Sequence, residues 1–232
     1  MNKFSGNIST SDSKTRYIES LGVAEYGEFT LGKNTTRILH EDPKLLLFSL
    51  ARHKFVSKMF SGFDHVLEIG CHEGFCSVIV SQTVNHLHGI DFYIPHIESC
   101  ERRIKNEKIT FEAIDILNEP MRMKYQGVFA LDVLEHIDPE SEDIFMKNIC
   151  DSLEEDGVLI LGMPSLQSQQ YASEASRIGH VNCKTGDQLN EISSRYFKNV
   201  FSFSMNDEVL HTGFFPLSHY LFVICTNRIK IR

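Results

Sequence analysis

Hydrophobic residues follow two different periods between residues 65 and 162, and the two periods alternate along the chain. Short apolar runs predict strands at residues 65–69, 87–90, 109–113, 128–131 and 158–162. Apolar residues at helical spacing predict helices at residues 74–82, 94–105 and 140–154. Strands that alternate with helices are typical of a mostly parallel sheet with helices on both faces. The pattern therefore predicts an α/β fold.

The segments on either side of this block have other patterns. Residues 1–40 are rich in Ser, Thr, Gly and Asn and show no period, which predicts an N-terminal arm or lid. Residues 43–59 predict a helix with Asp42 as its N-cap. Towards the carboxyl end, a capping box predicts a helix at residues 185–196, followed by two antiparallel strands at residues 199–205 and 219–225. After the arm, we expect one domain from residue 41 to residue 232.

Charge and composition exclude several classes of function. The formal net charge is −8, and the densest basic stretch, residues 101–105, is short and begins with an acid, so a nucleic-acid substrate is disfavoured. The first 15 residues lack the apolar centre of a signal peptide, and no apolar run approaches the length of a membrane span. The six cysteines form no CxxC pair, which argues against a zinc ribbon or a disulfide framework. We therefore expect a soluble cytoplasmic protein with reduced thiols.

A glycine-containing turn, VLEIGCHEGFCS at residues 66–77, follows the first predicted strand. A dinucleotide site needs the spacing G-x-G-x-x-G, so that pyrophosphate can lie on a helix N-terminus. Here the spacing is G-x-x-x-G, and the acids Glu68 and Glu73 would repel a pyrophosphate. They suit a ligand that carries an ammonium and a sulfonium group. Asp91, which ends the second predicted strand, is placed to accept hydrogen bonds from a ribose.

Residues 60–165, and more loosely the chain as far as residue 226, resemble the class I S-adenosylmethionine-dependent methyltransferases. The resemblance is carried by VLEIGCHEGF, by GID ending at Asp91, by AIDI at residues 113–116 and by LEEDGVLIL at residues 153–161. YQGVFALDVLEHI at residues 125–137 is similar to the ubiquinone-biosynthesis O-methyltransferases. The resemblance implies a Rossmann-like, mostly parallel, seven-stranded sheet whose last strand is antiparallel. It divides the domain into a cofactor-binding core, residues 60–165, and a substrate-side part, residues 163–226.

The resemblance also implies that S-adenosyl-L-methionine is the cofactor. The residues implied to bind it are Glu68, Gly70, Cys71, His72, Gly74, Asp91, Phe92, Asp115, Ile116, Leu131 and Asp132. His72 departs from the family pattern, because many relatives have a third glycine there, and we expect its side chain to point to solvent. Arg52 and His53 could neutralise the carboxylate of the cofactor, although a surface salt bridge explains Arg52 equally well.

The methyl-transfer reaction needs a place for the proton of the acceptor. His136 lies shortly beyond the fourth predicted strand, and imidazole is a natural base near neutral pH; the alternative is that it packs or caps the turn. His180 is the second candidate catalytic residue, in a polar region that follows the fifth strand. The predicted substrate-binding residues are Ser165, Tyr171, Asn182 and His211. His136, His180 and His211, with Asp207 and Glu208, lack a short ligand spacing, so no metal site is predicted.

The acceptor is predicted to be a small molecule. The carboxyl-terminal sequence is similar to that of bacterial methyltransferases of undefined substrate, some of them associated with surface-glycan assembly. This resemblance favours O-methylation of a sugar or sugar-nucleotide. The alternatives are a non-catalytic scaffold or partner subunit, a quinone or phenol O-methyltransferase and an NAD-binding oxidoreductase, the last of which is disfavoured by the G-x-x-x-G spacing. The sequence predicts no oligomeric state.

Overall fold

The computed structural model describes residues 12–21 and 28–229. Contacts divide the chain into two compact units, residues 1–30 and residues 31–232. In the first unit, helix α1 (Ser13–Ser20) begins after Asp12, whose carboxylate accepts hydrogen bonds from the backbone N–H groups of Lys14 and Thr15. Part of the predicted arm or lid, residues 1–11 and 22–27, lies outside the described residues, so its role stays a prediction.

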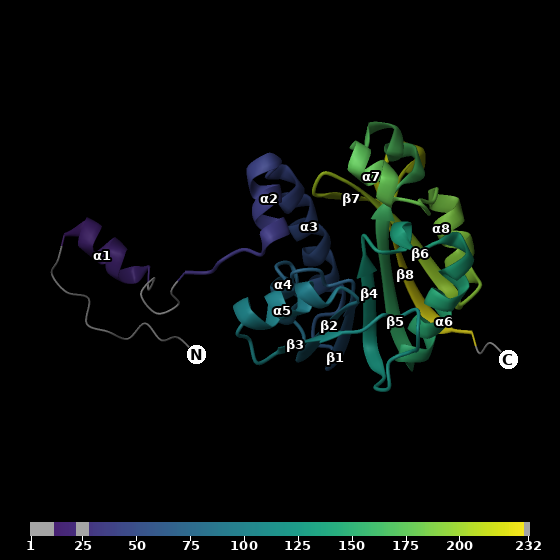
Figure 1. Cartoon of the computed structure of the whole chain (residues 1–232), viewed down its shortest axis with the longest axis horizontal. Helices are drawn as coiled ribbons and strands as arrows, with labels where there is room; N and C mark the ends of the chain where they lie inside the picture. The colour runs from purple at the N-terminus through teal and green to yellow at the C-terminus, as the bar shows by residue number, and fades with distance from the viewer. Residues whose placement is uncertain (1–11, 22–27, 230–232) are drawn as a thin grey trace. The chain divides into compact units, whose positions relative to one another are not determined.

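The second unit is built on a sheet that has eight strands among the described residues, in the order β3-β2-β1-β4-β5-β8-β6-β7 (Figure 1). The strands are β1 (His65–Ile69), β2 (His86–Asp91), β3 (Ile109–Ala113), β4 (Tyr125–Leu131), β5 (Leu153–Pro164), β6 (Phe197–Asn206), β7 (Val209–His211) and β8 (Tyr220–Arg228). β1 to β5 pair in parallel, and β8 is antiparallel to both β5 and β6. The predicted parallel sheet with antiparallel final strands is confirmed. The additional strand is β7, which extends the edge as a hairpin with β6.

Helices cover both faces of the sheet, as predicted. They are α2 (Lys33–Glu41), α3 (Lys44–Met59), α4 (Ser77–Ser81), α5 (Ile94–Arg103), α6 (Glu142–Ser152), α7 (Glu174–Gly179) and α8 (Gly186–Ser194). Successive strand residues point to opposite faces, and each face has its own core. Val66 of β1 packs in one core with Phe60 beyond α3 and Val80 of α4. Leu67 packs in the other core with Phe145 of α6 and with residues of α8.

Helix α2 lies where the sequence shows no helical period. It lies within the second unit, and its N-terminal N–H groups are satisfied by Glu73, a residue about 40 positions away along the chain. A local period could not reveal a helix whose start depends on such a distant partner. By contrast, α8 has the predicted local capping box between Thr185 and Gln188.

The connection from β3 to β4 contains no helix, and residues 114–124 cross the sheet as an irregular segment. Its Ile116 and Met121 are buried in the core that includes α6. Because β1, β2, β4 and β5 are parallel, the turns after them meet at one edge of the sheet, where open α/β folds bind ligands. This edge is called the carboxyl edge below.

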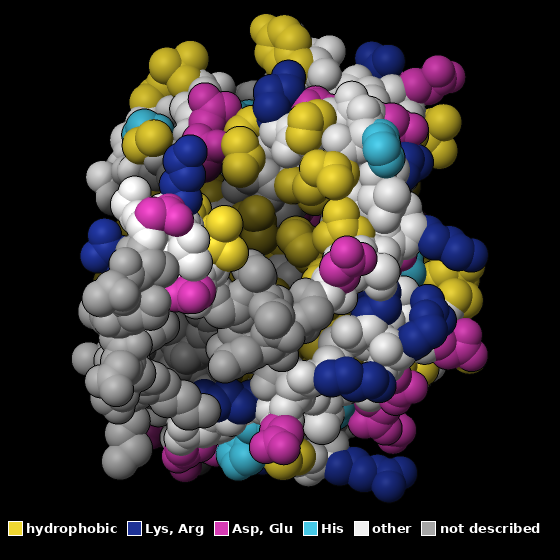
Figure 2. All heavy atoms as spheres, turned by 90° about the vertical axis from the view of Figure 1, so that its left-hand side faces the viewer, with side chains coloured by type: hydrophobic (Ala, Val, Ile, Leu, Met, Phe, Trp, Pro, Cys, Tyr) yellow, Lys and Arg dark blue, Asp and Glu magenta, His cyan; other side chains and the backbone are white. Residues whose placement is uncertain are grey.

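Several large hydrophobic side chains remain exposed on the second unit. They include Leu45 and Leu47 of α3, Phe92 and Tyr93 after β2, and Leu210, Phe214 and Leu217 between β6 and β8. Figure 2 shows hydrophobic side chains gathered in the upper half of one face of the molecule. No helix within residues 12–21 and 28–229 combines the length and the apolar character that a membrane span requires.

Candidate functional site

The turn after β1 has three residues in the left-handed backbone region: Gly70 (φ 75°), His72 (φ 52°) and Gly74 (φ 69°). A Cβ on Gly70 would lie 2.4 Å from Cγ2 of Val133, in the turn after β4. A Cβ on Gly74 would lie 2.7 Å from Cδ1 of Ile104. Both glycines are therefore required by the close approach of neighbouring segments as well as by the backbone conformation.

Asp91 holds this turn in place from the end of β2. One carboxylate oxygen accepts the backbone N–H of His72 and the other that of Tyr93, each at 2.9 Å. His72 Nε2 lies 2.8 Å from the side-chain nitrogen of Asn34, and its ring stacks at an angle against His96, with centroids 4.1 Å apart. Burial and His96 lower the pKa of His72. The expectation that His72 points to solvent is wrong, because α2 and α5 contribute side chains that cover it.

Glu73 does not face a ligand. Its carboxylate accepts the backbone N–H groups of Asn34 and Thr35 at 3.1 and 2.9 Å, and the Thr35 hydroxyl at 3.0 Å. Burial acts to raise the pKa of Glu73, but these hydrogen bonds outweigh it and lower the pKa. The interpretation of Glu73 as an acid of the ligand site is therefore wrong; it caps α2.

Glu68 is the acid of this turn that keeps an oxygen available. Oε1 lies 3.1 Å from Nε2 of His53 on α3, whereas Oε2 is buried and has no hydrogen-bond partner among the described residues. Burial would lower the pKa of His53, but Cys76 and Glu68 raise it well above its ordinary value. Glu68 can thus accept a hydrogen bond from a cationic ligand at the carboxyl edge.

Asp132 follows β4 directly and is also left-handed, with φ 57°. Both of its carboxylate oxygens accept hydrogen bonds from Nη1 of Arg52, at 2.9 and 3.1 Å. The Arg52 guanidinium lies over the ring of Tyr220, 3.7 Å from its centroid. Arg52 is therefore paired with Asp132 through Nη1 in a half-buried site, while its Nε has no hydrogen-bond partner among the described residues. Its contact with a cofactor carboxylate stays a prediction.

The remaining predicted cofactor residues lie at or just beyond the carboxyl ends of β1 to β4. Cys71, Ile116 and Leu131 are buried, and Phe92 is exposed. Asp115 accepts the backbone N–H of Leu117 and so shapes the turn after β3. Their contacts with a cofactor stay a prediction.

The two predicted catalytic histidines lie side by side. The rings of His136 and His180 meet edge to face, with centroids 5.0 Å apart. His136 Nδ1 lies 2.8 Å from the carbonyl oxygen of Gly179, and His180 Nδ1 lies 2.8 Å from Oε1 of Gln169. Burial and the neighbouring His136 lower the pKa of His180. The fold thus brings together two residues that are 44 positions apart along the chain.

Glu135, next to His136, is a site residue that the sequence analysis missed. Its side chain is fully buried, and neither carboxylate oxygen has a hydrogen-bond partner among the described residues. Burial and the nearby Asp132 raise the pKa of Glu135 well above its ordinary value. The sequence LEHI contained the signal, because the acid directly precedes the histidine, but only the fold shows that it is buried and unpartnered.

Comparisons with known proteins bear on the family and the fold. Residues 66–157 match the family described as methyltransferase domain. The N-methyltransferase NodS from Bradyrhizobium japonicum, solved with S-adenosyl-L-homocysteine, has 19% identity and a TM-score of 0.59, over 82% of this chain and 90% of that one. The plantazolicin methyltransferase BpumL, solved with S-adenosyl-L-homocysteine and a desmethyl plantazolicin analogue, has 14% identity and a TM-score of 0.62, over 84% and 90%.

A chain of the Haloferax volcanii complex that contains the Trm112 methyltransferase activator has 9% identity and a TM-score of 0.64, over 85% of this chain and 99% of that one. No curated protein sequence matches the chain. Residues 66–157 therefore carry the match to the methyltransferase-domain family, and the chain shares its fold with solved S-adenosylmethionine-dependent methyltransferases. The fold expected from the sequence is confirmed.

The predicted substrate-binding residues of the methyltransferase domain have different environments. The buried Ser165 hydroxyl donates to the carbonyl oxygen of Ser218, and the buried Asn182 side chain bridges Glu142 and Lys184. Both side chains are therefore used to hold the protein together. Tyr171 is 84% exposed, and His211 is exposed on β7 at the sheet edge. Tyr171 and His211 stay predictions, and the structure does not join His211 to the pair of His136 and His180.

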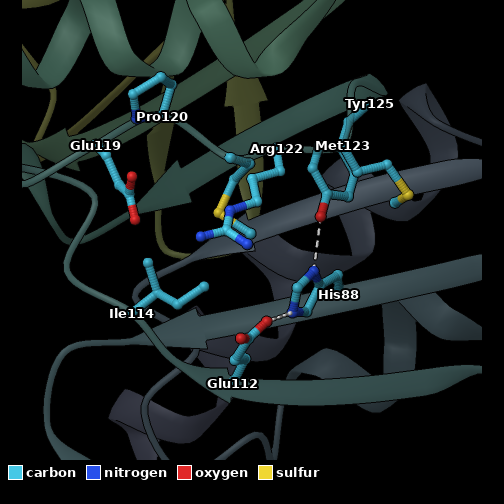
Figure 3. A pocket seen from close by; sticks show the side chains of 9 residues that line it. His88, Glu112, Ile114, Glu119, Pro120, Arg122, Met123 and Tyr125 are labelled. Atoms are coloured by element: carbon cyan, nitrogen blue, oxygen red, sulfur yellow. Dashed lines mark hydrogen bonds and ion pairs between the residues drawn. The ribbon is translucent and has the colours of Figure 1, made fainter.

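The methyltransferase domain has another cavity, of about 420 Å³, on the sheet face that residues 114–124 cross. Figure 3 shows His88 between Glu112 and Tyr125 in this cavity. His88 Nδ1 lies 2.6 Å from the Tyr125 hydroxyl, and Nε2 lies 3.3 Å from Glu112. These residues come from the middle of β2, from β3 and from the start of β4, and the connection between β3 and β4 lines the rest of the cavity.

Proposed function

We propose that this protein transfers the methyl group of S-adenosylmethionine to a hydroxyl group of a small molecule, with a sugar or sugar-nucleotide as the acceptor. The observation that carries the proposal is the pair of His136 and His180 beyond β4, whose rings lie edge to face with centroids 5.0 Å apart. Two imidazoles at this position can orient an acceptor hydroxyl and receive its proton. The oxygen then attacks the methyl carbon as the carbon–sulfur bond breaks.

The turn after β1 is the proposed cofactor site. Gly70 and Gly74 allow close backbone approach, Oε2 of Glu68 is available to an ammonium group, and Asp91 has lone pairs left for a ribose diol. NodS and BpumL, which share the fold, were solved with S-adenosyl-L-homocysteine. This supports the same cofactor here.

A small acceptor fits the charge of the chain and the character of the neighbours. The net charge of −8 disfavours a phosphate backbone as substrate. BpumL was solved with a desmethyl analogue of plantazolicin, so the fold accepts substrates smaller than a folded protein. The similarity of the carboxyl-terminal sequence to methyltransferases linked to surface-glycan assembly favours a sugar over a phenol.

The test has a binding part and a transfer part. Calorimetry should detect binding of S-adenosyl-L-homocysteine, and Asp91→Ala should weaken it by about 10-fold to 100-fold, because a hydrogen bond to a charged group is lost. Incubation with methyl-labelled S-adenosylmethionine and a panel of nucleotide sugars, polyprenols, phenols and peptides should then label a sugar. Binding of the cofactor product without transfer to any sugar would contradict the acceptor class.

The alternative is a non-catalytic scaffold or a partner subunit. The Haloferax volcanii complex gives this reading a specific basis, because in that complex a chain of the same fold is accompanied by an activator protein. The calorimetric experiment separates the two readings. Absence of S-adenosyl-L-homocysteine binding, with the protein folded, would favour the scaffold.

A further inference from the structure

Three potential metal ligands converge beyond β4. Glu135 and His136 belong to the short helix η2 (Leu134–His136), and His180 follows α7. One ligand atom from each residue lies within 4.8 Å of the other two. Three ligand atoms at this separation can bind a single ion with little movement of the side chains.

The hydrogen bonds of the two histidines fix which nitrogen is available. A carbonyl or amide oxygen can only accept, so Nδ1 of His136 donates to Gly179 and Nδ1 of His180 donates to Gln169, each over 2.8 Å. In a neutral imidazole this leaves the lone pair on Nε2. Metal-bound histidines in proteins are oriented in the same way, with the second nitrogen donating to an oxygen.

Glu135 provides an independent observation. Its side chain is fully buried, and both carboxylate oxygens lack a hydrogen-bond partner within the described part of the chain. The nearby cation, Arg52, directs Nη1 to both carboxylate oxygens of Asp132, and its buried Nε makes no hydrogen bond to Glu135. A buried carboxylate is rarely left without a partner, because its desolvation is then uncompensated. A cation bound between Glu135 and the histidines would supply the missing partner.

We propose that Glu135, His136 and His180 bind one divalent transition-metal ion, of the class of Zn²⁺, Mn²⁺ or Co²⁺, with coordination positions left open. Two imidazoles and one carboxylate form a donor set that suits these ions. The sequence predicted no metal site, because the ligands have no short common spacing. The fold provides the missing proximity by placing the residue after α7 against the turn after β4.

The role of the ion rests on the proposed function. An acceptor hydroxyl bound at an open position would lose its proton to solvent more readily, because the metal lowers its pKa. The resulting oxygen attacks the sulfonium methyl carbon, and the electron pair of the carbon–sulfur bond goes to sulfur. In this arrangement His136 and His180 act as ligands, which replaces the proton-accepting role given to them in the metal-free site, and they hold the acceptor in place through the metal.

The test uses Co²⁺ as the probe, titrated into the metal-free full-length protein. Visible absorption bands and a calorimetric signal for one ion per chain are expected, with an increase in melting temperature. Glu135→Gln, His136→Gln and His180→Gln should each weaken Co²⁺ binding by about tenfold or more. Gln169→Ala removes only the oxygen that orients His180, so it should weaken Co²⁺ binding less.

The matched control is His65→Gln, at the opposite edge of the sheet. His65 is exposed and His86 is half-buried, and their ring centroids lie 6.1 Å apart, so they form an imidazole pair that lacks a buried carboxylate. Co²⁺ affinity should be unchanged in this variant. The proposal is overturned if wild type gives no visible bands, or if the Glu135 and His180 variants bind Co²⁺ as tightly as wild type while melting at the wild-type temperature.

Binding of S-adenosyl-L-homocysteine, measured on the same samples, separates this proposal from the proposed function. Cofactor-product binding without Co²⁺ binding would overturn the metal site and leave the methyltransferase proposal intact. Co²⁺ binding that depends on Glu135, without cofactor-product binding, would support the metal site and contradict the methyl-transfer role assigned to it.

Discussion

The turn after β1 and the turn after β4 lie at the same edge of the sheet, and both contain a non-glycine residue in the left-handed region, His72 and Asp132. They use their polar groups differently. In the first turn, Asp91 and Glu73 direct their oxygens to backbone N–H groups. In the second, Glu135 has no partner among the described residues, and the adjacent His136 keeps Nε2 available.

The difference separates a turn whose backbone is held by carboxylates, with one oxygen of Glu68 left over, from a turn whose Glu135 has no partner on either oxygen. Hydrogen bonds to the backbone fix the first turn in one conformation before any cofactor arrives, which lowers the entropy cost of binding. An unpartnered buried carboxylate costs folding free energy, and such costs are concentrated at functional sites.

The largest effect is expected from Gly74→Ala in the first turn. The new Cβ meets Ile104 and Phe111 at 2.7 and 2.8 Å, and φ is 69°. Left-handed strain and overpacking together should lower the free energy of unfolding by about 2–5 kcal/mol, measured by urea denaturation.

Gly62→Ala is the matched control for this substitution. Gly62 has φ 87°, and nothing lies within 4 Å of its added Cβ. Only left-handed backbone strain should therefore lower the free energy of unfolding, by about 1–2 kcal/mol. If both variants lose the same free energy of unfolding, the first turn is not closely packed around Gly74.

A pair of amide substitutions compares the two turns directly. Asp91→Asn leaves one of two backbone N–H groups without its carboxylate acceptor, so the free energy of unfolding should fall by about 1–3 kcal/mol. Glu135→Gln removes no hydrogen bond and should change it by less than about 0.5 kcal/mol in the metal-free protein. A loss in Glu135→Gln as large as in Asp91→Asn would mean that Glu135 has a partner in solution.

The narrowest test is a pH dependence in the first turn. The folded-state pKa of His53 is raised, so the pair with Glu68 contributes its full stability below the unfolded value of about 6.5. The contribution is lost as the pH rises through the folded pKa. His53→Gln should therefore be less stable than wild type by about 2 kcal/mol near pH 6, with a gap that narrows at higher pH.

Thermal or urea unfolding between pH 5.5 and 9 measures this gap. His40→Gln, on the exposed face of α2, is the matched control for the loss of a histidine. If the stability difference between wild type and His53→Gln widens as the pH rises, the pKa of His53 is lowered in the folded state and not raised. That result would contradict an ion pair between His53 and Glu68.

The candidate site was predictable where its residues are close together along the chain. The glycines of the first turn, the acid that ends β2 and the catalytic candidate His136 all follow strands that hydrophobic periodicity reveals. The roles of Glu73 and Glu135 could not be predicted. Whether an acid faces a helix N-terminus, a ligand or nothing depends on segments that are far away in sequence.

The sequence by itself determined the alternation of strands and helices, the parallel sheet and the turn that identifies the family, because each depends on periods and spacings within about 20 residues. Only the tertiary structure decided that α2 forms on Glu73, that Arg52 pairs with Asp132 and that His180 joins Glu135 and His136. These contacts follow from strand order and from the packing of helices on the sheet. Both are set by burial of the two cores as a whole, which no local pattern encodes.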